Sequence, residues 1–390
     1  MKINKFFIFL GIVAFIFAYL QGGNLPYSIF YMFLVALIFG IIDIKLKQRA
    51  LEVEVKIEKD MYSAGDIEKI EVSATDNSIF PIQYVVIKNK TFSELNSKYN
   101  GDAVSINGLG FAVIRNNVRF IRRGVYNFGE TELAYGDLFG IIKKTILVDA
   151  RRTVKVYPKL YEINDITLLG NGQFEKSKST RSVLEDLATT RDVRKYKDGD
   201  NLKRVHWKLS AKYGELYVKN ADTLACEESN IFIDMSIENM NRDGNGATEE
   251  ALIDFSVSLI NILVKRNVDS KIFINNSDAS QFTMNSPEEL KELLEFFLVQ
   301  KSDGEMSFSD FIAYNVAGIQ HLSRVVMICI EPSRKLINHI IRLKEEGYRI
   351  TLCCMSDKLN PTSMELLRTS EIECISINTV LDTLLRNKVK

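Results

Sequence analysis

No charged residue lies between Lys5 and Asp43 of this chain. Turn-forming residues divide the stretch into two apolar runs, residues 6–20 and 25–42. The first run is short against the roughly 20 residues that a helix needs to cross a bilayer, whereas the second is nearly long enough. The pattern therefore predicts a transmembrane helical hairpin over residues 1–43.

Basic residues flank the apolar runs on both sides. Lys2 and Lys5 precede them, and Lys45, Lys47 and Arg49 follow them. A cleaved signal peptide is the alternative, but no small-residue cleavage site follows the first run and a second apolar run does. Because positively charged flanks stay on the cytoplasmic side, we expect a two-pass protein of the cell membrane with its soluble domains in the cytoplasm.

The composition of the whole chain is that of a folded, multidomain protein. Its 390 residues are 46% hydrophobic and 26% charged, with only 6 Pro and 21 Gly, and this length suits two or three domains. Lys and Arg number 50, as do Asp and Glu, so we expect no nucleic-acid partner. The 5 cysteines show no C-x-x-C spacing, which argues against a disulfide framework or a zinc cluster.

Alternation of apolar and charged residues begins after the apolar runs. Residues 51–58 alternate strictly between the two kinds, which is the pattern of a half-buried strand. Further short strands are expected at residues 70–74, 84–87, 111–120 and 131–134. Strands of this length and spacing predict an antiparallel β-sandwich-like module at residues 44–160.

From residue 229 onward, apolar strands alternate with amphipathic helices. The expected strands are residues 231–234, 271–275, 325–330, 350–354 and 372–377. The expected helices are residues 249–265, 287–298, 335–346 and 362–369. This alternation is typical of a parallel sheet covered by helices on both faces, so we predict an α/β domain at residues 229–390.

A basic segment at residues 161–228 links these two modules. Residues 151–220 carry 16 basic and 9 acidic side chains, although the whole chain is neutral. Arginine side chains beside a tryptophan can bind a carboxylate, a phosphate or an acidic protein surface. Alternatively, Asp200 pairs with an arginine and the segment only clips the two domains together. The candidate residues for either role are Arg194, Tyr196, Asp200, Arg204, His206, Trp207 and Lys208.

Nothing in the sequence completes a catalytic constellation around His206. No motif places a Ser or Cys nucleophile or an orienting acid beside it, and His321 and His339 are isolated. The glycine pairs of the chain lack the fingerprints of dinucleotide and ATP sites. We therefore predict no catalytic residue. The alternative is a hydrolase or transferase that uses Asp200 and His206.

Asp234 and Ser236 follow the apolar core of the first expected strand in the α/β domain. Open sheets bind ligands at the carboxyl ends of their strands, and an Asp and a Ser two residues apart can hold Mg²⁺. Glu331 and Asp357, each just past a later strand, can supply further carboxylate. Alternatively, Asp234 and Ser236 only cap the segment that follows them. Mg²⁺ is thus the one cofactor for which the sequence offers a candidate site.

The basic segment resembles the hallmark of a bacterial and archaeal family called domain of unknown function 58. That hallmark resembles R-x-Y-x-x-G-D-x-x-R-x-I-H-W-K-x-S-A. Residues 194–211 fit it, with Val205 for Ile and Asp198 where Pro is usual. Three upstream stretches also resemble the family, at residues 123–126, 137–140 and 156–158. With the two apolar runs, the resemblance covers nearly the whole chain.

The resemblance implies an architecture and a partner. Such proteins typically have a membrane hairpin, a β-rich region and a C-terminal domain similar to von Willebrand factor type A. Many are encoded beside a MoxR-type AAA+ ATPase, so the implied role is an adaptor or chaperone-like partner of that ATPase. The metal motif of type A domains resembles D-x-S-x-S: Asp234 and Ser236 match it, Glu238 replaces its second Ser, and Glu331 stands near its later Asp.

The expected protein is multidomain, with a transmembrane helical hairpin, a β-sandwich-like module and a C-terminal α/β type A-like domain. We expect a non-enzymatic, membrane-anchored cytoplasmic scaffold or adaptor that acts with a MoxR-type ATPase in the assembly or maturation of envelope complexes. Besides the hydrolase or transferase, the remaining alternative is a purely structural envelope protein in which the basic segment is an interdomain clasp.

Overall fold

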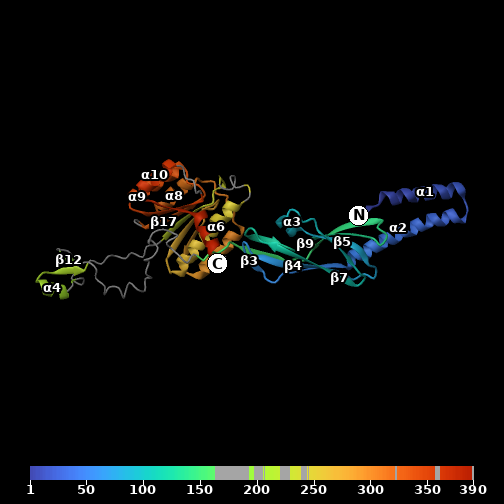
Figure 1. Cartoon of the computed structure of the whole chain (residues 1–390), viewed down its shortest axis with the longest axis horizontal. Coiled ribbons are helices and arrows are strands. Elements are labelled where there is room, and N and C mark those ends of the chain that lie inside the picture. The colour runs from blue at the N-terminus through green and yellow to red at the C-terminus, as the bar shows by residue number, and fades with distance from the viewer. Residues whose placement is uncertain are drawn as a thin grey trace. The chain divides into compact units, whose positions relative to one another are not determined.

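The computed structural model describes residues 1–162, 193–196, 205, 207–219, 229–238, 244, 246–320, 323–355 and 361–388. The chain divides into two compact units, Met1–Tyr157 and Pro158–Lys390. The first unit holds two N-terminal helices and antiparallel sheets, and the second holds a mostly parallel sheet (Figure 1). The mixed α/β, multidomain architecture expected from the sequence is confirmed at this level. The finer division at residues 43, 160 and 228 stays a prediction.

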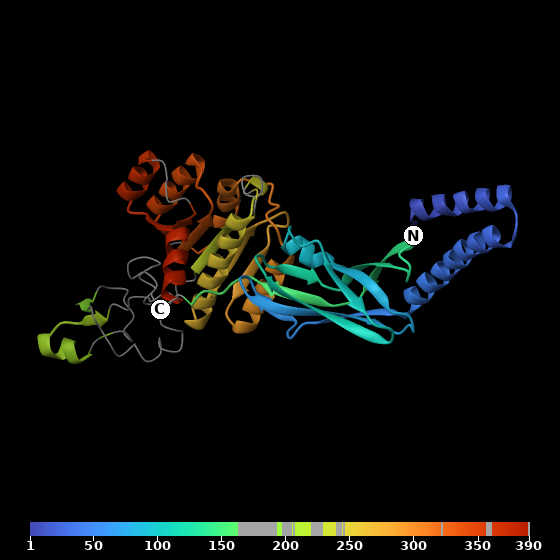
Figure 2. The same cartoon turned by 45° about the vertical axis from the view of Figure 1, so that its right-hand side comes forward.

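Two apolar helices occupy the two runs without charge. Helix α1 spans Lys5–Gln21 and α2 spans Asn24–Ala50. They run side by side, joined by a turn in which Gly22 and Gly23 have φ angles of 65° and 89° (Figures 1 and 2). Glycine adopts such angles readily because it lacks a Cβ. Among the described helices, α2 is the one long and apolar enough to cross a membrane, and α1 is a shorter apolar helix.

Helix α2 continues past the apolar run, which ends at Ile42, as far as Ala50. Lys47 belongs to the basic flank that follows the apolar run in the sequence, but its side chain is buried. It pairs with Asp43, one helical turn earlier and 2.8 Å away, because residues i and i+4 lie on the same helix face. The helix can therefore extend its buried face beyond the last apolar residue.

The first unit consists of sheets around one hydrophobic core. A three-stranded sheet has the order β2 (Leu51–Lys56), β4 (Ile67–Asp76) and β7 (Gly110–Arg119). A five-stranded sheet has the order β1 (Lys2–Ile3), β10 (Ile142–Asp149), β9 (Glu130–Gly136), β5 (Ile82–Asn89) and β6 (Asp102–Ile106). The remaining elements are β3 (Met61–Ser63), β11 (Thr153–Tyr157), β8 (Gly124–Asn127) and the short helix α3 (Lys90–Leu95).

The described strand pairings of this unit are antiparallel except that of β3 with β11. Alternate residues such as Ile70 and Val72 enter the core, as the period-2 pattern predicts.

Strand β1 has no signal in the sequence pattern. It pairs antiparallel with the first residues of β10, and the N–H of Asn4 then donates to the carbonyl of Ile141 at 2.8 Å. A Cβ on Gly40 of α2 would lie 3.4 Å from the side chain of Ile142. The chain therefore enters α1 and leaves the apolar part of α2 beside the same strand.

The second unit is built on a six-stranded sheet. Its strand order is β16 (Gln281–Met284), β15 (Ser270–Asn275), β14 (Ser229–Asp234), β17 (Arg324–Cys329), β18 (Arg349–Cys354) and β19 (Glu373–Ser376). Strand β16 is antiparallel to β15, and the other neighbours are parallel. The sequence pattern missed β16. It runs antiparallel because its connection to β15 is too short for a parallel crossover.

Helices cover both faces of this sheet (Figure 2). One hydrophobic cluster includes residues of α6 (Ala247–Lys265), α7 (Pro287–Val299) and α11 (Ile377–Lys388). The other includes residues of α8 (Phe308–Val316), α9 (Arg334–Glu345) and α10 (Pro361–Thr369). Along β14, Ile231 and Ile233 join the first cluster and Phe232 joins the second. Burial on both faces explains why these strands are continuous apolar runs.

Candidate functional site

The basic segment forms a small unit of two strands and one helix where the structure describes it. Its elements are β12 (Val193–Lys195), α4 (Trp207–Tyr213) and β13 (Tyr217–Lys219). The strands pair antiparallel, and the N–H of Tyr196 extends the ladder by donating to the carbonyl of Leu216 at 2.8 Å. The N–H of Tyr217 donates to Oγ of Ser210 at 2.9 Å, which ties α4 to β13. The motif thus has a local scaffold.

Helix α4 presents aromatic and cationic side chains to solvent. Trp207 begins the helix and is 65% exposed, and Lys208 is exposed beside it. Nζ of Lys212 lies 5.5 Å from the ring centroid of Tyr213, which is also exposed. Ser210, by contrast, is buried. Trp207, Lys208, Lys212 and Tyr213 are called the α4 surface below.

An ion pair between Lys195 and Glu215 lies at the surface of this unit. The hydrogen bond to Glu215 raises the pKa of Lys195 above its ordinary value. Both side chains are largely exposed, so the pair contributes little to stability. The hydrogen bonds to backbone groups, not this pair, therefore hold the unit together.

The structure describes part of the residue set predicted from the sequence. Arg194 lies within β12, and Tyr196 follows that strand and is half-buried. Outside the described residues lie Asp200, Arg204 and His206. The ion pairing and the catalytic role considered for them stay predictions. Trp207 and Lys208 have described side chains, and both are exposed.

The second candidate site lies at the carboxyl end of β14. This strand lies between β15 and β17. The chain first adds β15 and β16 on one side of β14 and then adds β17, β18 and β19 on the other, so the strand order reverses between β14 and β17. Open sheets bind ligands in the crevice at such a switch point. Asp234, the last residue of β14, is buried there. Its Oδ1 accepts hydrogen bonds from the N–H of Ser236 at 3.2 Å and from the side-chain amide of Asn275 at 3.3 Å.

Gly304 packs against the segment that follows β14. Its N–H donates to the carbonyl of Met235 at 2.9 Å, and its carbonyl accepts from the N–H of Ile237 at 2.8 Å. A Cβ on Gly304 would lie 2.3 Å from the carbonyl oxygen of Asn275, so a side chain cannot fit without displacement. The sequence pattern identified neither Asn275 nor Gly304 as part of this site. The position of Asn275 at a strand end was a usable signal, whereas nothing in the sequence connects Gly304 to Asp234.

These groups meet part of the requirement of Mg²⁺, which prefers octahedral oxygen coordination. Asp234 and Ser236 supply one carboxylate and one hydroxyl, while Glu238 and Glu331 are exposed. Within the described ranges, no three His, Cys, Asp or Glu side chains form a group that could hold a metal ion. Burial, and then the nearby charge of Asp234, raises the pKa of Cys329 well above its ordinary value. Its thiol therefore stays neutral near this site.

Residues 192–285 match the family described as protein of unknown function DUF58. The chain carries a DUF58 domain. The match includes α4 and the carboxyl end of β14, so both candidate sites fall within the DUF58 domain, while Glu331 lies beyond it. The resemblance found at residues 194–211 is thereby confirmed.

The uncharacterized protein YeaD of Bacillus subtilis strain 168 is a distant relative of this chain. The two are 21% identical over 359 residues, which cover 88% of this chain and 86% of YeaD. Among solved structures, the CARDB domain of a Pyrococcus furiosus protein, in complex with di-metal ions, is 15% identical over 27% of this chain and 86% of its own, with a TM-score of 0.20. Proximal thread matrix protein 1 from the mussel byssus is 11% identical over 40% of this chain and 46% of its own, with a TM-score of 0.30. Structural likeness at this level carries no inference about the DUF58 protein.

Proposed function

We propose that this DUF58 protein is a non-enzymatic, membrane-anchored adaptor that binds a protein partner through its α4 surface. The observation that supports this proposal is the exposure of Trp207: this side chain, the one tryptophan of the chain, is 65% exposed. Tryptophan often anchors protein interfaces because it brings a large rigid area and a hydrogen-bond donor.

The charge of the α4 surface suits an acidic partner. Lys208 follows Trp207 and Lys212 precedes Tyr213, and residues 151–220 carry 16 basic against 9 acidic side chains. Complementary charge speeds association and rejects partners of the wrong sign. The resemblance to the family makes a MoxR-type AAA+ ATPase the partner we propose, with a role in the assembly or maturation of envelope complexes.

The two apolar helices support a two-pass membrane anchor. At about 1.5 Å per residue, the 18 residues of the apolar run 25–42 in α2 extend about 27 Å and the 17 residues of α1 about 25 Å. Both lengths come close to the thickness of a bilayer's hydrocarbon core and cross it when their polar ends reach the interface. Strand β1 before α1 and Gly40 of α2 both lie against β10, so the two ends of the hairpin lie on one side. Exposed Lys2, Lys5, Lys45 and Arg49 favour the cytoplasm for that side.

The second unit supports a domain similar to von Willebrand factor type A. It has the required sheet with helices on both faces and a buried Asp234 at the switch point. In this proposal, Asp234 and Ser236 hold Mg²⁺, and an acidic residue of the partner completes the coordination shell. Partner binding would then depend on Mg²⁺ as well as on the α4 surface.

Affinity purification of the full-length protein from membranes of its own host tests the adaptor role. Wild type is compared with Trp207→Ala and with Tyr314→Ala. Tyr314 is 79% exposed on α8, outside the DUF58 match, and so is a matched control for loss of an exposed aromatic side chain. A central interface tryptophan contributes about 2 kcal/mol or more, so we expect enrichment of an AAA+ ATPase to fall about ten-fold or more in Trp207→Ala alone.

Two outcomes would overturn the proposal. Equal enrichment of the ATPase by all three proteins would reject the α4 surface as its binding site. Enrichment by none of them would reject the adaptor role and favour the structural envelope protein or the enzyme using Asp200 and His206.

A further inference from the structure

Four large apolar side chains are exposed near one end of the first unit. Ile79 lies between β4 and β5, Leu109 between β6 and β7, Phe139 between β9 and β10, and Phe111 near the start of β7. Their exposed fractions are 79%, 72%, 57% and 71%. Soluble proteins seldom expose several large apolar side chains in one place without a partner. These four residues are called the apolar tips below.

Contacts between the turns gather the apolar tips around α2. The N–H of Leu109 donates to the carbonyl of Ser78 at 2.8 Å, so the β4–β5 and β6–β7 turns lie together. The ring centroid of Phe39 in α2 lies 5.3 Å from that of Phe80 and 5.6 Å from that of Phe139. One helical side chain therefore contacts the turn that carries Ile79 and the turn that carries Phe139.

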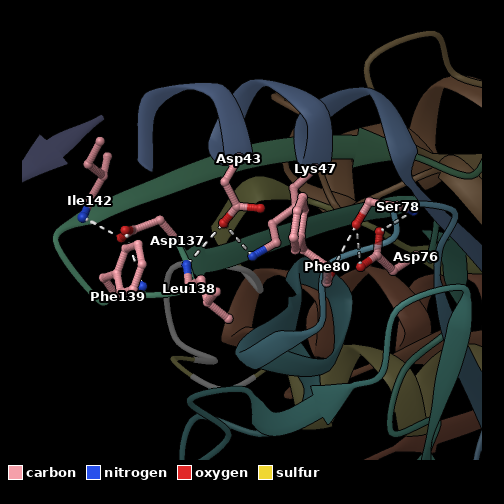
Figure 3. A network of polar contacts seen from close by, with 9 residues as sticks. All are labelled: Asp43, Lys47, Asp76, Ser78, Phe80, Asp137, Leu138, Phe139 and Ile142. Atoms are coloured by element: carbon pink, nitrogen blue, oxygen red, sulfur yellow. Dashed lines mark hydrogen bonds and ion pairs between the residues drawn. The ribbon is translucent and has the colours of Figure 1, made fainter. Parts of the chain in front are cut away.

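The same contacts show how far the β4–β5 and β9–β10 turns reach along α2 towards its apolar run. Asp43 is the first charged residue after the apolar run, and its Oδ2 accepts a hydrogen bond from the N–H of Leu138 at 3.0 Å (Figure 3). Phe39 lies one helical turn, or about 6 Å, nearer the middle of the apolar run. Because Phe39 contacts Phe80 and Phe139, two turns of the sheet reach past the point where charge begins on α2.

The carboxylates of these turns are occupied within the protein. Asp76 accepts hydrogen bonds from both the N–H and the hydroxyl of Ser78, each at 2.9 Å. Asp137 accepts from the N–H of Ile142 at 2.6 Å and from the N–H of Phe139 at 3.3 Å (Figure 3). Both carboxylates are buried. Each one accepts hydrogen bonds from backbone N–H groups of its own turn, so neither carboxylate is exposed at the surface beside the apolar tips.

The exposed side chains beside the ends of the helical hairpin carry positive charge. Lys2 of β1 pairs in register with Lys143 of β10, and both are exposed, as is Lys45 of α2. Lysine side chains at a membrane surface are attracted to anionic headgroups. A bilayer with anionic lipids therefore complements this end of the unit in both its apolar and its charged groups.

We infer that the apolar tips insert into the headgroup and acyl boundary of the bilayer that α2 crosses, which holds the first unit directly on the membrane surface. This rests on the membrane anchor proposed above. The position of the apolar tips favours lipid as their partner. A bilayer around the apolar run of α2 ends within one helical turn of Phe39, which contacts the turns that carry Ile79 and Phe139. Large apolar side chains gain free energy in this boundary layer.

The single tryptophan of the chain makes a direct test available. Trp207→Phe removes the native signal, and Ile79→Trp, Phe139→Trp, Tyr31→Trp or Tyr314→Trp is added to it, one at a time, in the full chain. The proteins are reconstituted in vesicles of phosphatidylcholine and phosphatidylglycerol whose acyl chains carry bromine near the headgroup or near the bilayer centre. Bromine quenches tryptophan fluorescence on contact, so the loss of fluorescence reports depth.

Tyr31 lies within the apolar run of α2 and reports the anchor, while Tyr314 on α8 of the second unit is the control for an exposed aromatic side chain outside the apolar tips. We expect Ile79→Trp and Phe139→Trp to lose most fluorescence with bromine near the headgroup, and Tyr314→Trp to lose none. Melting temperatures in detergent equal to that of Trp207→Phe establish that the variants fold.

The controls separate two kinds of failure. If Tyr31→Trp is quenched and both tip variants behave like Tyr314→Trp, the lipid contact of the apolar tips is wrong and the anchor stands. If Tyr31→Trp is not quenched either, the anchor itself is wrong, and the lipid contact fails with it.

Discussion

Lys47 donates a hydrogen bond to Asp43 across 2.8 Å, and both side chains are buried (Figure 3). The same oxygen of Asp43 accepts the N–H of Leu138, so the pair joins α2 to the β9–β10 turn. Removing two charges from water costs free energy that their attraction only partly offsets. The pair therefore sets the position of α2 on the sheet more than it adds net stability.

Lys47→Met should be strongly destabilising because it leaves the Asp43 carboxylate buried without its cation. We expect a loss of about 3–5 kcal/mol in the free energy of unfolding, measured by denaturant titration in detergent. Lys45→Met, an exposed change on the same helix, should shift stability by no more than about 0.5 kcal/mol. Equal effects of the two substitutions would show that the buried pair has no special role.

The hydroxyl of Tyr135 is buried and has no hydrogen-bond partner in the part of the chain that the structure describes. Tyr135→Phe should therefore leave stability unchanged or raise it by about 1 kcal/mol. Tyr99→Phe is the matched control, since its hydroxyl donates to Asp102 at 3.0 Å, and it should lower stability by a similar amount. Denaturant titration near neutral pH distinguishes the two, and a clear loss in Tyr135→Phe would contradict the expectation.

Tyr135 should also contribute to alkaline unfolding. Burial, and then the charge of Asp43, raises its pKa from 10.0 to about 12. The folded state holds this proton more tightly than the unfolded state, so titration of Tyr135 leaves the free energy of unfolding unchanged below pH 10 and lowers it as the pH rises from 10 to about 12. Tyr135→Phe should flatten the fall of stability in that interval, which a series of unfolding curves would measure. An unchanged slope would count against the assignment.

Gly304→Ala should destabilise the second unit because the added Cβ would meet the carbonyl of Asn275 at 2.3 Å. Overpacking of this kind costs about 1–3 kcal/mol. The matched control is Gly318→Ala, whose Cβ would lie 3.6 Å from the nearest oxygen, an ordinary contact distance. Melting curves should show a clear decrease for Gly304→Ala alone, and similar curves for both variants would refute the close approach.

Mg²⁺ should raise the melting temperature of the wild-type protein and not that of Asp234→Asn. At 100 times its dissociation constant, a ligand that binds only the folded state stabilises it by about 2.7 kcal/mol. Asp269→Asn removes an exposed carboxylate just before β15, at the opposite end of that strand from Asn275, and should keep the wild-type shift. Glu238→Gln and Glu331→Gln test whether either residue joins the coordination shell. Equal shifts in wild type and Asp234→Asn would place the binding elsewhere.

Local pattern predicted the strands and helices with the most regular spacing, whereas β10, α8 and α11 were among the longer elements that it missed. The strict alternation at residues 51–58 corresponds to β2, and the apolar spacing at residues 249–265 corresponds to α6. Both elements bury one face repeatedly, so their period is visible along the chain. Strands β1 and β16 were missed because two and four residues are too few to show a period. Their pairing depends on neighbours instead.

The family motif at residues 194–211 and the charge-free N-terminal run are properties of the chain itself, so residue type and spacing alone reveal both. The folded structure was needed for the buried state of Lys47, the approach of Gly304 to Asn275, and the bond from Leu138 to Asp43, which are 95 residues apart. Such contacts join distant parts of the chain, and their formation follows from how helices and sheets pack. The sequence determines which groups are available, and packing determines which of them meet and which remain in water.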